Sequence, residues 1–323
     1  MSRTYHVVLN PTSGGGLGRR LRGEVERELE VRGIGFTLTE TARRGHAVEI
    51  ARAAAERGID VVVAAGGDGT IHEVANGILS AAGGRPPAAL GVIPIGTGND
   101  FAKLLEGGLD RGRAYEALAA ARTVDFDVGV VEWDGGREYF VNGMGTGVDV
   151  EVVRQMERLP RLPGVVSYLV ALVRAVVGFR AIPLRIALDG RREERRVMII
   201  AIGNGPCLGG GFWVTPRARP DDGRFDICIV DDLNYYRIAR TVPRIMRGTH
   251  EGLPDVSMSS ARTIELEAAS GQPLFFHLDG ELREPAGARR LRIEVAPAAL
   301  RVVGGKATVA SGPAAPSAAA GSR

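Results

Sequence analysis

Three glycine-rich segments each follow an apolar run and precede a helical pattern. They are residues 10–16 (NPTSGGG), 66–70 (GGDGT) and 96–100 (GTGND). Glycine lets backbone N–H groups approach a ligand closely, and a following helix N-terminus adds unpaired N–H groups and partial positive charge. In an open parallel sheet such turns lie together at the carboxyl ends of the strands. Together they predict a polyphosphate site, although any one alone is equally consistent with a tight connection.

The common nucleotide-binding templates do not fit these turns. No segment reads G-x-x-x-x-G-K-[ST], which excludes a Walker-type phosphate loop. The dinucleotide pattern G-x-G-x-x-G also fails, because its sixth position is occupied by Arg19, His72 and Phe101 in the three turns. The H-R-D signature of protein kinases is absent as well. The phosphate site is therefore of another type.

The ordered motifs resemble the diacylglycerol kinase catalytic-domain family, and most of all its soluble bacterial lipid kinases. The resemblance rests on GGDGTIHEV and GVIPIGTGNDFAK, and it extends through residues 10–16, 40–47, 202–230 and 277–282. It implies ATP and Mg²⁺ as cofactors and a lipid hydroxyl, above all that of diacylglycerol, as the phosphate acceptor. A kinase for phosphatidylglycerol, ceramide or a sphingoid base is the alternative, and an NAD kinase is a more distant one. An idle nucleotide- or lipid-binding regulator is disfavoured, because the acidic motif residues Asp68, Asp222, Asp279 and Glu281 are all present.

In such kinases the nucleotide lies between two domains, and the resemblance implies which residues contact it. Contacts to phosphate or ribose fall on Asn10, Pro11, Thr12, Ser13 and Gly14, and Thr41 lines the nucleotide site. The phosphates are wrapped by Gly66, Gly67, Asp68, Gly69, Thr70, Ile71 and His72, with Thr97 reaching them from the next turn. The hydroxyls of Thr70 and Thr97 suit phosphate oxygens, but threonine also caps helices. His72 stands where relatives often carry asparagine, and we expect it to contact phosphate or to cap the helix.

Asp68 is the anomalous residue of the second turn. A carboxylate beside phosphates is repelled unless a cation intervenes. Mg²⁺ arrives with ATP, prefers oxygen ligands and keeps several of its waters. We therefore expect Asp68 to hold Mg²⁺ through water or to orient a catalytic group. The alternative is a solvent-exposed turn aspartate.

Two further acidic motifs lie in the second half of the chain. For residues 279–282 (DGEL) the resemblance implies that Glu281 is the catalytic carboxylate, with Asp279 beside it. Phosphoryl transfer needs an in-line hydroxyl whose proton is accepted as it reacts. On the residues alone, Asp-Gly is also a hairpin-turn signal. For residues 219–227 (RPDDGRFDI) the resemblance implies a structural Mg²⁺ site formed by Asp222 and the main-chain oxygens of Arg219 and Arg224, and an Asp-Gly turn is again the alternative.

The elements that must position these residues divide the chain in two. Strand-like and helical patterns alternate over residues 1–124, which predicts a nucleotide-binding α/β domain with a mostly parallel sheet, of the NAD kinase and diacylglycerol kinase type by resemblance. Residues 125–303 read mainly as hairpins, which predicts an antiparallel β-sandwich that carries the lipid substrate, with a last strand that is a candidate to return to the first domain. Residues 304–323 are small and polar, so we expect a disordered tail.

Composition narrows the function classes. The length of 323 residues fits two domains. A formal net charge of +3 argues against a nucleic-acid partner. The two cysteines, Cys207 and Cys228, indicate neither a disulfide framework nor a zinc site, and a small buried thiol is the expectation for Cys207.

The remaining expectations concern location and membrane contact. The chain opens with a strand-like run in place of a signal peptide, and the apolar stretch at 165–179 is too short to span a bilayer. We expect a cytoplasmic protein, peripheral to the inner face of the membrane. The basic segment 152–185 predicts either an interfacial amphipathic helix or a core helix with a solvated arginine face. The sequence leaves a homodimer open.

Overall fold

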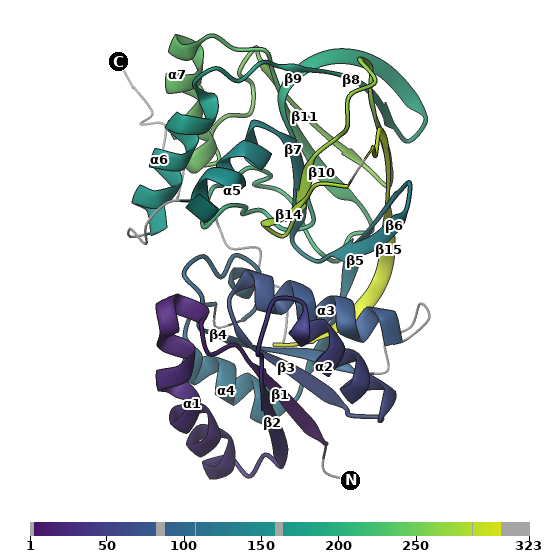
Figure 1. Cartoon of the computed structure of the whole chain (residues 1–323). Helices are drawn as coiled ribbons and strands as arrows, with labels where there is room; N and C mark the ends of the chain where they lie inside the picture. The colour runs from purple at the N-terminus through teal and green to yellow at the C-terminus, as the bar shows by residue number, and fades with distance from the viewer. Residues whose placement is uncertain (1–2, 82–87, 107, 159–163, 286, 305–323) are drawn as a thin grey trace, which may run out of the picture.

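The computed structural model describes residues 3–81, 88–106, 108–158, 164–285 and 287–304, which form two lobes (Figure 1). The tail that we predicted to be disordered lies, beyond residue 304, outside the described residues.

The first lobe is a parallel sheet with strand order β2-β1-β3-β4. Its strands are β1 (Tyr5–Leu9), β2 (Phe36–Glu40), β3 (Val61–Gly66) and β4 (Ala89–Pro94). Its helices are α1 (Ser13–Val31), α2 (His46–Glu56), α3 (Asp68–Ala81), the short 3₁₀ turn η1 (Ala102–Leu104) and α4 (Arg111–Ala120).

Strand β3 shows why this sheet is parallel and covered on both faces. Every residue of β3 is buried, and alternate side chains enter different cores. Val62 packs in a core that contains the apolar residues of α2 and α3. Val63, on the opposite face, packs in a core that contains residues of α1 and α4. A continuous apolar run is the pattern that such double burial requires, and the predicted α/β domain is confirmed.

The second lobe is a mainly antiparallel β-sandwich, also as predicted. Its strands are β5 (Thr123–Trp133), β6 (Gly136–Phe140), β7 (Gly143–Gly147), β8 (Ile182–Leu188), β9 (Arg191–Gly203), β10 (Phe225–Asp231), β11 (Val256–Ala261), β12 (Thr263–Ala268), β13 (Phe276–Leu278), β14 (Glu281–Arg283) and β15 (Arg290–Val303). Inward-facing apolar side chains of these strands form one core, centred on residues such as Phe140, Phe225 and Phe276.

Three helices lie together on one side of the second lobe: α5 (Val148–Arg158), α6 (Gly164–Val176) and α7 (Tyr235–Met246) (Figure 1). The segment 152–185, in which we expected an amphipathic or a core helix, contains most of α5 and the whole of α6. Among the described residues no helix is both long and apolar enough to cross a bilayer.

The long strands β5 and β15 connect the lobes. They pair antiparallel over most of their length, and Val302 near the end of β15 pairs in parallel with Leu90 of β4. The register shifts between Ala296 and Leu300. At this irregularity Ala298 has a φ of 50°, and its N–H donates to Asp127 Oδ1 at 2.8 Å. The described strands therefore form one continuous sheet, which fixes how the lobes face each other.

Candidate active site

The glycine-rich turns meet at the carboxyl ends of the parallel strands. A Cβ placed on Gly67 would lie 3.0 Å from the Cα of Gly96, so the second and third turns touch backbone to backbone. A Cβ on Gly14, whose φ is 59°, would collide with the carbonyl oxygen of Ile95. These glycines are needed because the turns pack directly on one another, and this contact brings their backbones to a single site.

A polar cavity of about 430 Å³ opens beside these turns. It is lined by Asn10, Thr12, Ser13, Thr41, Ala42, Arg43, Arg44, Ala47, Gly67, Gly69, Thr70, Glu73 and Glu281. Asn10 organises its floor: the side-chain amide donates to Thr70 Oγ1 at 3.0 Å, and its carbonyl oxygen accepts from the backbone N–H of Thr12 at 3.0 Å. Seven of the fourteen residues of the predicted nucleotide site therefore line this one cavity.

Some members of the predicted set lie elsewhere. The side chain of Ile71 is fully buried in the core between α3 and the sheet, so at most its backbone faces a ligand. Pro11 is buried as well, and Gly66 is the last residue of β3, where a Cβ would strike the side chain of Thr70. Thr97 is exposed and lines a different cavity, on the side of the second lobe.

That second cavity has a volume of about 640 Å³ and runs from Asp68 and Thr97 into the second lobe. Its far wall is apolar and is contributed mainly by α5 and β9: Val152, Val153, Met156, Ile199, Ala201, Leu208 and Val214. It adjoins a smaller apolar cavity of about 80 Å³ between β9, β10 and the helices α5, α6 and α7, and the two share Asp149, Val152, Ile199 and Val214 in their walls. The two cavities together offer room for a long apolar ligand that extends from Asp68 towards α6 and α7.

Asp68 begins α3 at the mouth of this cavity. One of its carboxylate oxygens accepts from the N–H of Phe101 at 3.1 Å. Burial and the nearby carboxylate of Asp100 raise the pKa of Asp68 to about 6. Asp100 is itself held by Lys103 at 2.6 Å and by the N–H of Gly210 at 2.6 Å. Asp68 is therefore not a solvent-exposed turn residue.

The surroundings of Asp68 fit Mg²⁺ delivered with phosphates. The Asp100 carboxylate contributes to the raised pKa of Asp68, and a divalent cation between two such carboxylates relieves their repulsion. In the described part of the chain no three His, Cys, Asp or Glu side chains converge as a complete metal cage. Mg²⁺ bound with nucleotides needs only one or two carboxylates and takes its other oxygens from phosphate and water.

Glu281 stands where the two cavities meet. It is the first residue of β14, and it pairs with Leu278 of β13 across a two-residue turn. The turn residues Asp279 and Gly280 have φ values of 51° and 84°, as a type I′ hairpin requires. The hairpin and the catalytic interpretations of DGEL are therefore compatible, because the hairpin presents Glu281. Among the residues that line the cavities, Gly69 and Glu281 belong to both walls.

The Glu281 carboxylate is held against the glycine turn. It forms an ion pair with Arg44, and a Cβ on Gly69 would lie 2.5 Å from its Oε1. Because Gly69 has no side chain, the Glu281 carboxylate of the second lobe can reach the first turn of α3.

Asp279, which we predicted to act beside Glu281, is turned inward. Its side chain accepts from the backbone N–H groups of Val141, Asn142 and Gly143 at 3.0, 2.8 and 2.9 Å. A fourth contact joins its Oδ2 to His72 Nδ1 at 2.8 Å. With its oxygens occupied in this way, Asp279 anchors the hairpin.

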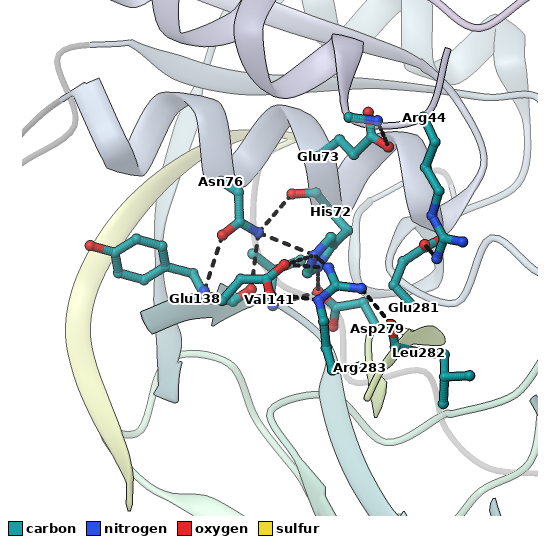
Figure 2. A network of polar contacts seen from close by, with 12 residues as sticks. Arg44, His72, Glu73, Asn76, Glu138, Val141, Asp279, Glu281, Leu282 and Arg283 are labelled. Carbon is teal, nitrogen blue, oxygen red and sulfur yellow. Dashed lines mark hydrogen bonds and ion pairs between the residues drawn. The ribbon is translucent and has the colours of Figure 1, made fainter. Parts of the chain in front are cut away.

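His72 contacts two carboxylates of the second lobe (Figure 2). Its ring is buried, and its Nε2 lies 2.9 Å from Glu138 Oε1 on β6. Burial alone would lower the pKa of His72, but the bonds to Asp279 and Glu138 raise it to about 9. Our expectation that His72 contacts phosphate or caps the helix is wrong for its side chain, because both ring nitrogens are occupied across the lobe boundary.

Several site residues were missed by sequence reasoning. Arg283 donates from Nε to Glu138 Oε2 at 2.6 Å, and its Nη2 lies 3.2 Å from His72 Nε2. Asn76, one turn after His72, exchanges two bonds with the backbone of Tyr139 at 3.0 Å each (Figure 2). Only Arg283 had a signal, since it directly follows DGEL.

The predicted structural metal site forms a compact acidic turn. Asp222 accepts from the N–H of Arg224 at 3.0 Å, and the side chain of Arg219 pairs with Asp221. Burial and the charge of Asp222 raise the pKa of Asp226 to about 6. This acidic pair fits a hard cation, and the site stays a prediction. Cys207 is buried, and burial raises the pKa of its thiol to about 12, as a structural thiol requires.

The chain is similar to known proteins over most of its length. Residues 4–131 match the family model "Diacylglycerol kinase catalytic domain", and residues 142–304 match "YegS C-terminal NAD kinase beta sandwich-like domain". A diacylglycerol kinase of Staphylococcus haemolyticus is 30% identical over 87% of this chain and 83% of its own. One of Bacillus subtilis is 30% identical over 85% and 88%. A solved structure of a putative diacylglycerol kinase from Bacillus anthracis matches with a TM-score of 0.74 at 23% identity, covering 94% of this chain and 97% of that one.

Proposed function

Because the chain belongs to the diacylglycerol kinase family, we propose that it is an ATP-dependent lipid kinase that phosphorylates diacylglycerol to phosphatidic acid. The observation that carries this proposal is the position of Glu281. Its carboxylate lies in the walls of both a polar cavity and a partly apolar one. A phosphoryl donor in the first and a lipid hydroxyl in the second would meet at this group.

In this proposal ATP occupies the polar cavity. Asn10, Thr12 and Ser13 offer side-chain and backbone groups to its ribose or phosphates. The N–H groups of Thr70 and Ile71 already donate to the carbonyl of Gly67, so this proposal assigns the phosphates to the N–H groups that precede them at the start of α3. Asp68 holds Mg²⁺ through water, together with phosphate oxygens. When bound, Mg²⁺ neutralises charge on the transferring phosphoryl group.

Glu281 acts as the general base. The acceptor hydroxyl oxygen forms the new bond to the γ-phosphorus as the bond to the β–γ bridging oxygen breaks, and ADP leaves. The hydroxyl proton moves to the Glu281 carboxylate. Asp279 holds the hairpin and takes no proton, because its oxygens are engaged by three backbone N–H groups and His72.

The lipid acceptor enters through the smaller apolar cavity beside α5, α6 and α7. This route requires the protein to make a peripheral contact with the inner face of the membrane. Around this cavity α6, α7 and the residue after α6 expose apolar side chains: Leu169, Val173, Val177, Tyr235 and Tyr236. Arginines stand among them on the same segments: Arg174, Arg180, Arg237, Arg240 and Arg247. Apolar anchors mixed with cations suit an anionic bilayer surface. The α7 tyrosines add to the segment 152–185 that the sequence had indicated.

The test is a phosphorylation assay with purified protein, Mg²⁺ and γ-labelled ATP. The acceptors are diacylglycerol, phosphatidylglycerol, ceramide, sphingosine and NAD. We expect labelled phosphatidic acid. Label in NAD and in none of the lipids would establish the NAD kinase alternative and overturn the proposal.

The variant Glu281→Gln tests whether Glu281 is the general base. Glu281→Gln is expected to lose at least 100-fold in kcat, which is about the lower end of the usual contribution of general-base catalysis. It should remain folded and bind ATP. Glu284→Gln is the matched control, because Glu284 lies three residues after Glu281, is exposed, and pairs with Arg154 of α5. Near-normal kcat in Glu281→Gln would remove Glu281 from the mechanism.

A further inference from the structure

The bonds that hold the DGEL hairpin differ in what they connect. Asp279 accepts three N–H groups from residues 141–143, and these bonds lie within the second lobe. They fix the shape of the hairpin but not its distance from the nucleotide side. The bond from Asp279 to His72 instead reaches α3, whose first turn carries Asp68 and Gly69.

The other ring nitrogen of His72 is linked to the opposite end of the hairpin through Glu138. His72 Nε2 lies 2.9 Å from Glu138, and Glu138 binds Arg283 through both of its carboxylate oxygens. Asp279 and Arg283 stand two residues before and two residues after Glu281. His72 is therefore linked to both flanks of the proposed base, directly on one side and through one side chain on the other (Figure 2).

The charges of this group balance. Two carboxylates, Asp279 and Glu138, face two cations, Arg283 and a His72 ring that donates from both nitrogens. Arg283 and His72 hold the pKa of Glu138 at about 2, against the effect of its burial. The side-chain amide of Asn76 donates to the backbone carbonyls of His72 and Tyr139, and so links this turn of α3 to β6 beside the ring. Such a group is tightly held as a whole, but loss of one member leaves a buried charge without its partner.

We propose that His72 is a positioning residue, which sets the distance between the Glu281 hairpin and the first turn of α3 by binding both flanks of that hairpin. The proposal rests on the assignment of Glu281 as the base. His72 lies four residues after Asp68 on one helix. The same rigid element thus carries the phosphate turn at its N-terminus and, one turn later, the contact that places the carboxylate of the other lobe.

The first test removes the ring and keeps the nucleotide cavity, whose wall does not include His72. In His72→Ala, kcat for lipid phosphorylation is expected to fall about 10- to 100-fold, the range for a misplacement of up to about 1 Å. KM for ATP should stay within about twofold. His6→Asn is the matched control, since His6 is a buried histidine of the first lobe that contacts Thr37 on β2. It should leave kcat unchanged.

Two conservative variants separate the contact with Asp279 from the contact with Glu138. They also cover the case that the alanine variant fails to fold. The amide of His72→Asn can donate from near the position of Nδ1 and retain Asp279. That of His72→Gln can donate from near the position of Nε2 and retain Glu138. We expect His72→Asn to keep more kcat, because Asp279 is bonded directly and is part of the turn itself. Wild-type kcat in the alanine variant, or in His72→Gln where the alanine variant does not fold, would overturn the proposal.

A double-mutant cycle distinguishes positioning from general stability. If His72 acts through Glu281, its replacement should cost little further kcat in a Glu281→Gln background. The same fold-loss in both backgrounds would show that His72 acts independently of Glu281 and would refute the inference. Because wild-type turnover is measured in the same experiment, failure of the proposed function would appear separately, as a wild type without lipid kinase activity.

Discussion

Gly69→Ala offers the sharpest test of how Glu281 is placed. Gly69 is the second residue of α3 and has ordinary helical geometry, so alanine fits the backbone there. The added Cβ would lie 2.5 Å from Glu281 Oε1 and 3.5 Å from its Cδ. The rest of the helix and both cores are not touched. Among the protein atoms, the substitution therefore pushes on the proposed base alone. Because Gly69 also lines the nucleotide cavity, KM for ATP is measured together with kcat.

The size of the effect follows from this distance. Ordinary contact between Cβ and oxygen begins near 3.4 Å, so the carboxylate must retreat by about 0.9 Å. A misplacement of about 1 Å costs on the order of 100-fold in rate, which corresponds to about 2.7 kcal/mol in the barrier. Stability should not suffer in parallel, because the displaced atoms are the end of a flexible side chain and alanine favours the helix over glycine by up to about 1 kcal/mol.

The assay pairs steady-state kinetics on detergent-dispersed diacylglycerol with urea unfolding. We expect Gly69→Ala to lose about 100-fold in kcat with an unfolding free energy equal to or above that of the wild type. Gly23→Ala is the control, since Gly23 is an exposed glycine of α1 with no atom near its Cβ position. It should gain stability and keep kcat. If Gly69→Ala retained kcat within about threefold, the carboxylate would not be confined to this position and the reasoning would fail.

Other predictions concern pH, metal and membrane. The pKa of His72 is about 9 in the folded protein, against an ordinary value of 6.5 that we take for the unfolded chain. Protonated His72 therefore stabilises the folded protein by up to about 3 kcal/mol, an effect that is present below pH 6.5 and lost as pH rises through 9. Urea unfolding of the wild type and of His72→Asn across this pH range would detect it. Glu138, with a pKa of about 2 against 4.5, stabilises above pH 4.5 and loses this effect as pH falls towards 2, as acid unfolding of Glu138→Gln would show. The pKa of Asp68, about 6, predicts that Mg²⁺ affinity by calorimetry weakens as pH falls below 6 and that Asp68→Asn removes this dependence. Replacing the exposed Tyr235 and Tyr236 with serine should weaken binding to anionic vesicles about tenfold, by about 1.4 kcal/mol, and leave kcat on detergent-dispersed substrate unchanged.

The parts of the fold that local patterns determine were predictable. The run DVVVAA at residues 60–65 is typical of a strand that is buried on both faces, and β3 sends alternate side chains into two cores. The Asp-Gly pair at 279–280 indicated a hairpin, and its turn residues adopt the required left-handed conformation. In both cases the cause lies within a few consecutive residues, so the sequence carries the signal.

The parts of the site that depend on distant partners were not predictable. His72 meets Glu138 and Asp279, which are 66 and 207 residues away in the chain. No period or spacing connects these positions, and the histidine alone suggested phosphate contact or capping. Gly69 is a related case: the sequence explains it as a phosphate-loop glycine, whereas the structure adds Glu281 as the side chain for which the space is kept.

These two residues of α3 make opposite demands on one carboxylate. Gly69 is small, so that Glu281 can approach the phosphate turn, and His72 is large enough to contact Asp279 and Glu138, which hold the flanks of Glu281. A larger residue at position 69 would push the base away, and a smaller one at position 72 would let it drift. Because both act from one rigid helix that also begins with Asp68, helix geometry, at about 1.5 Å of rise per residue, sets the spacing between the proposed Mg²⁺ ligand and the two residues that place the proposed base.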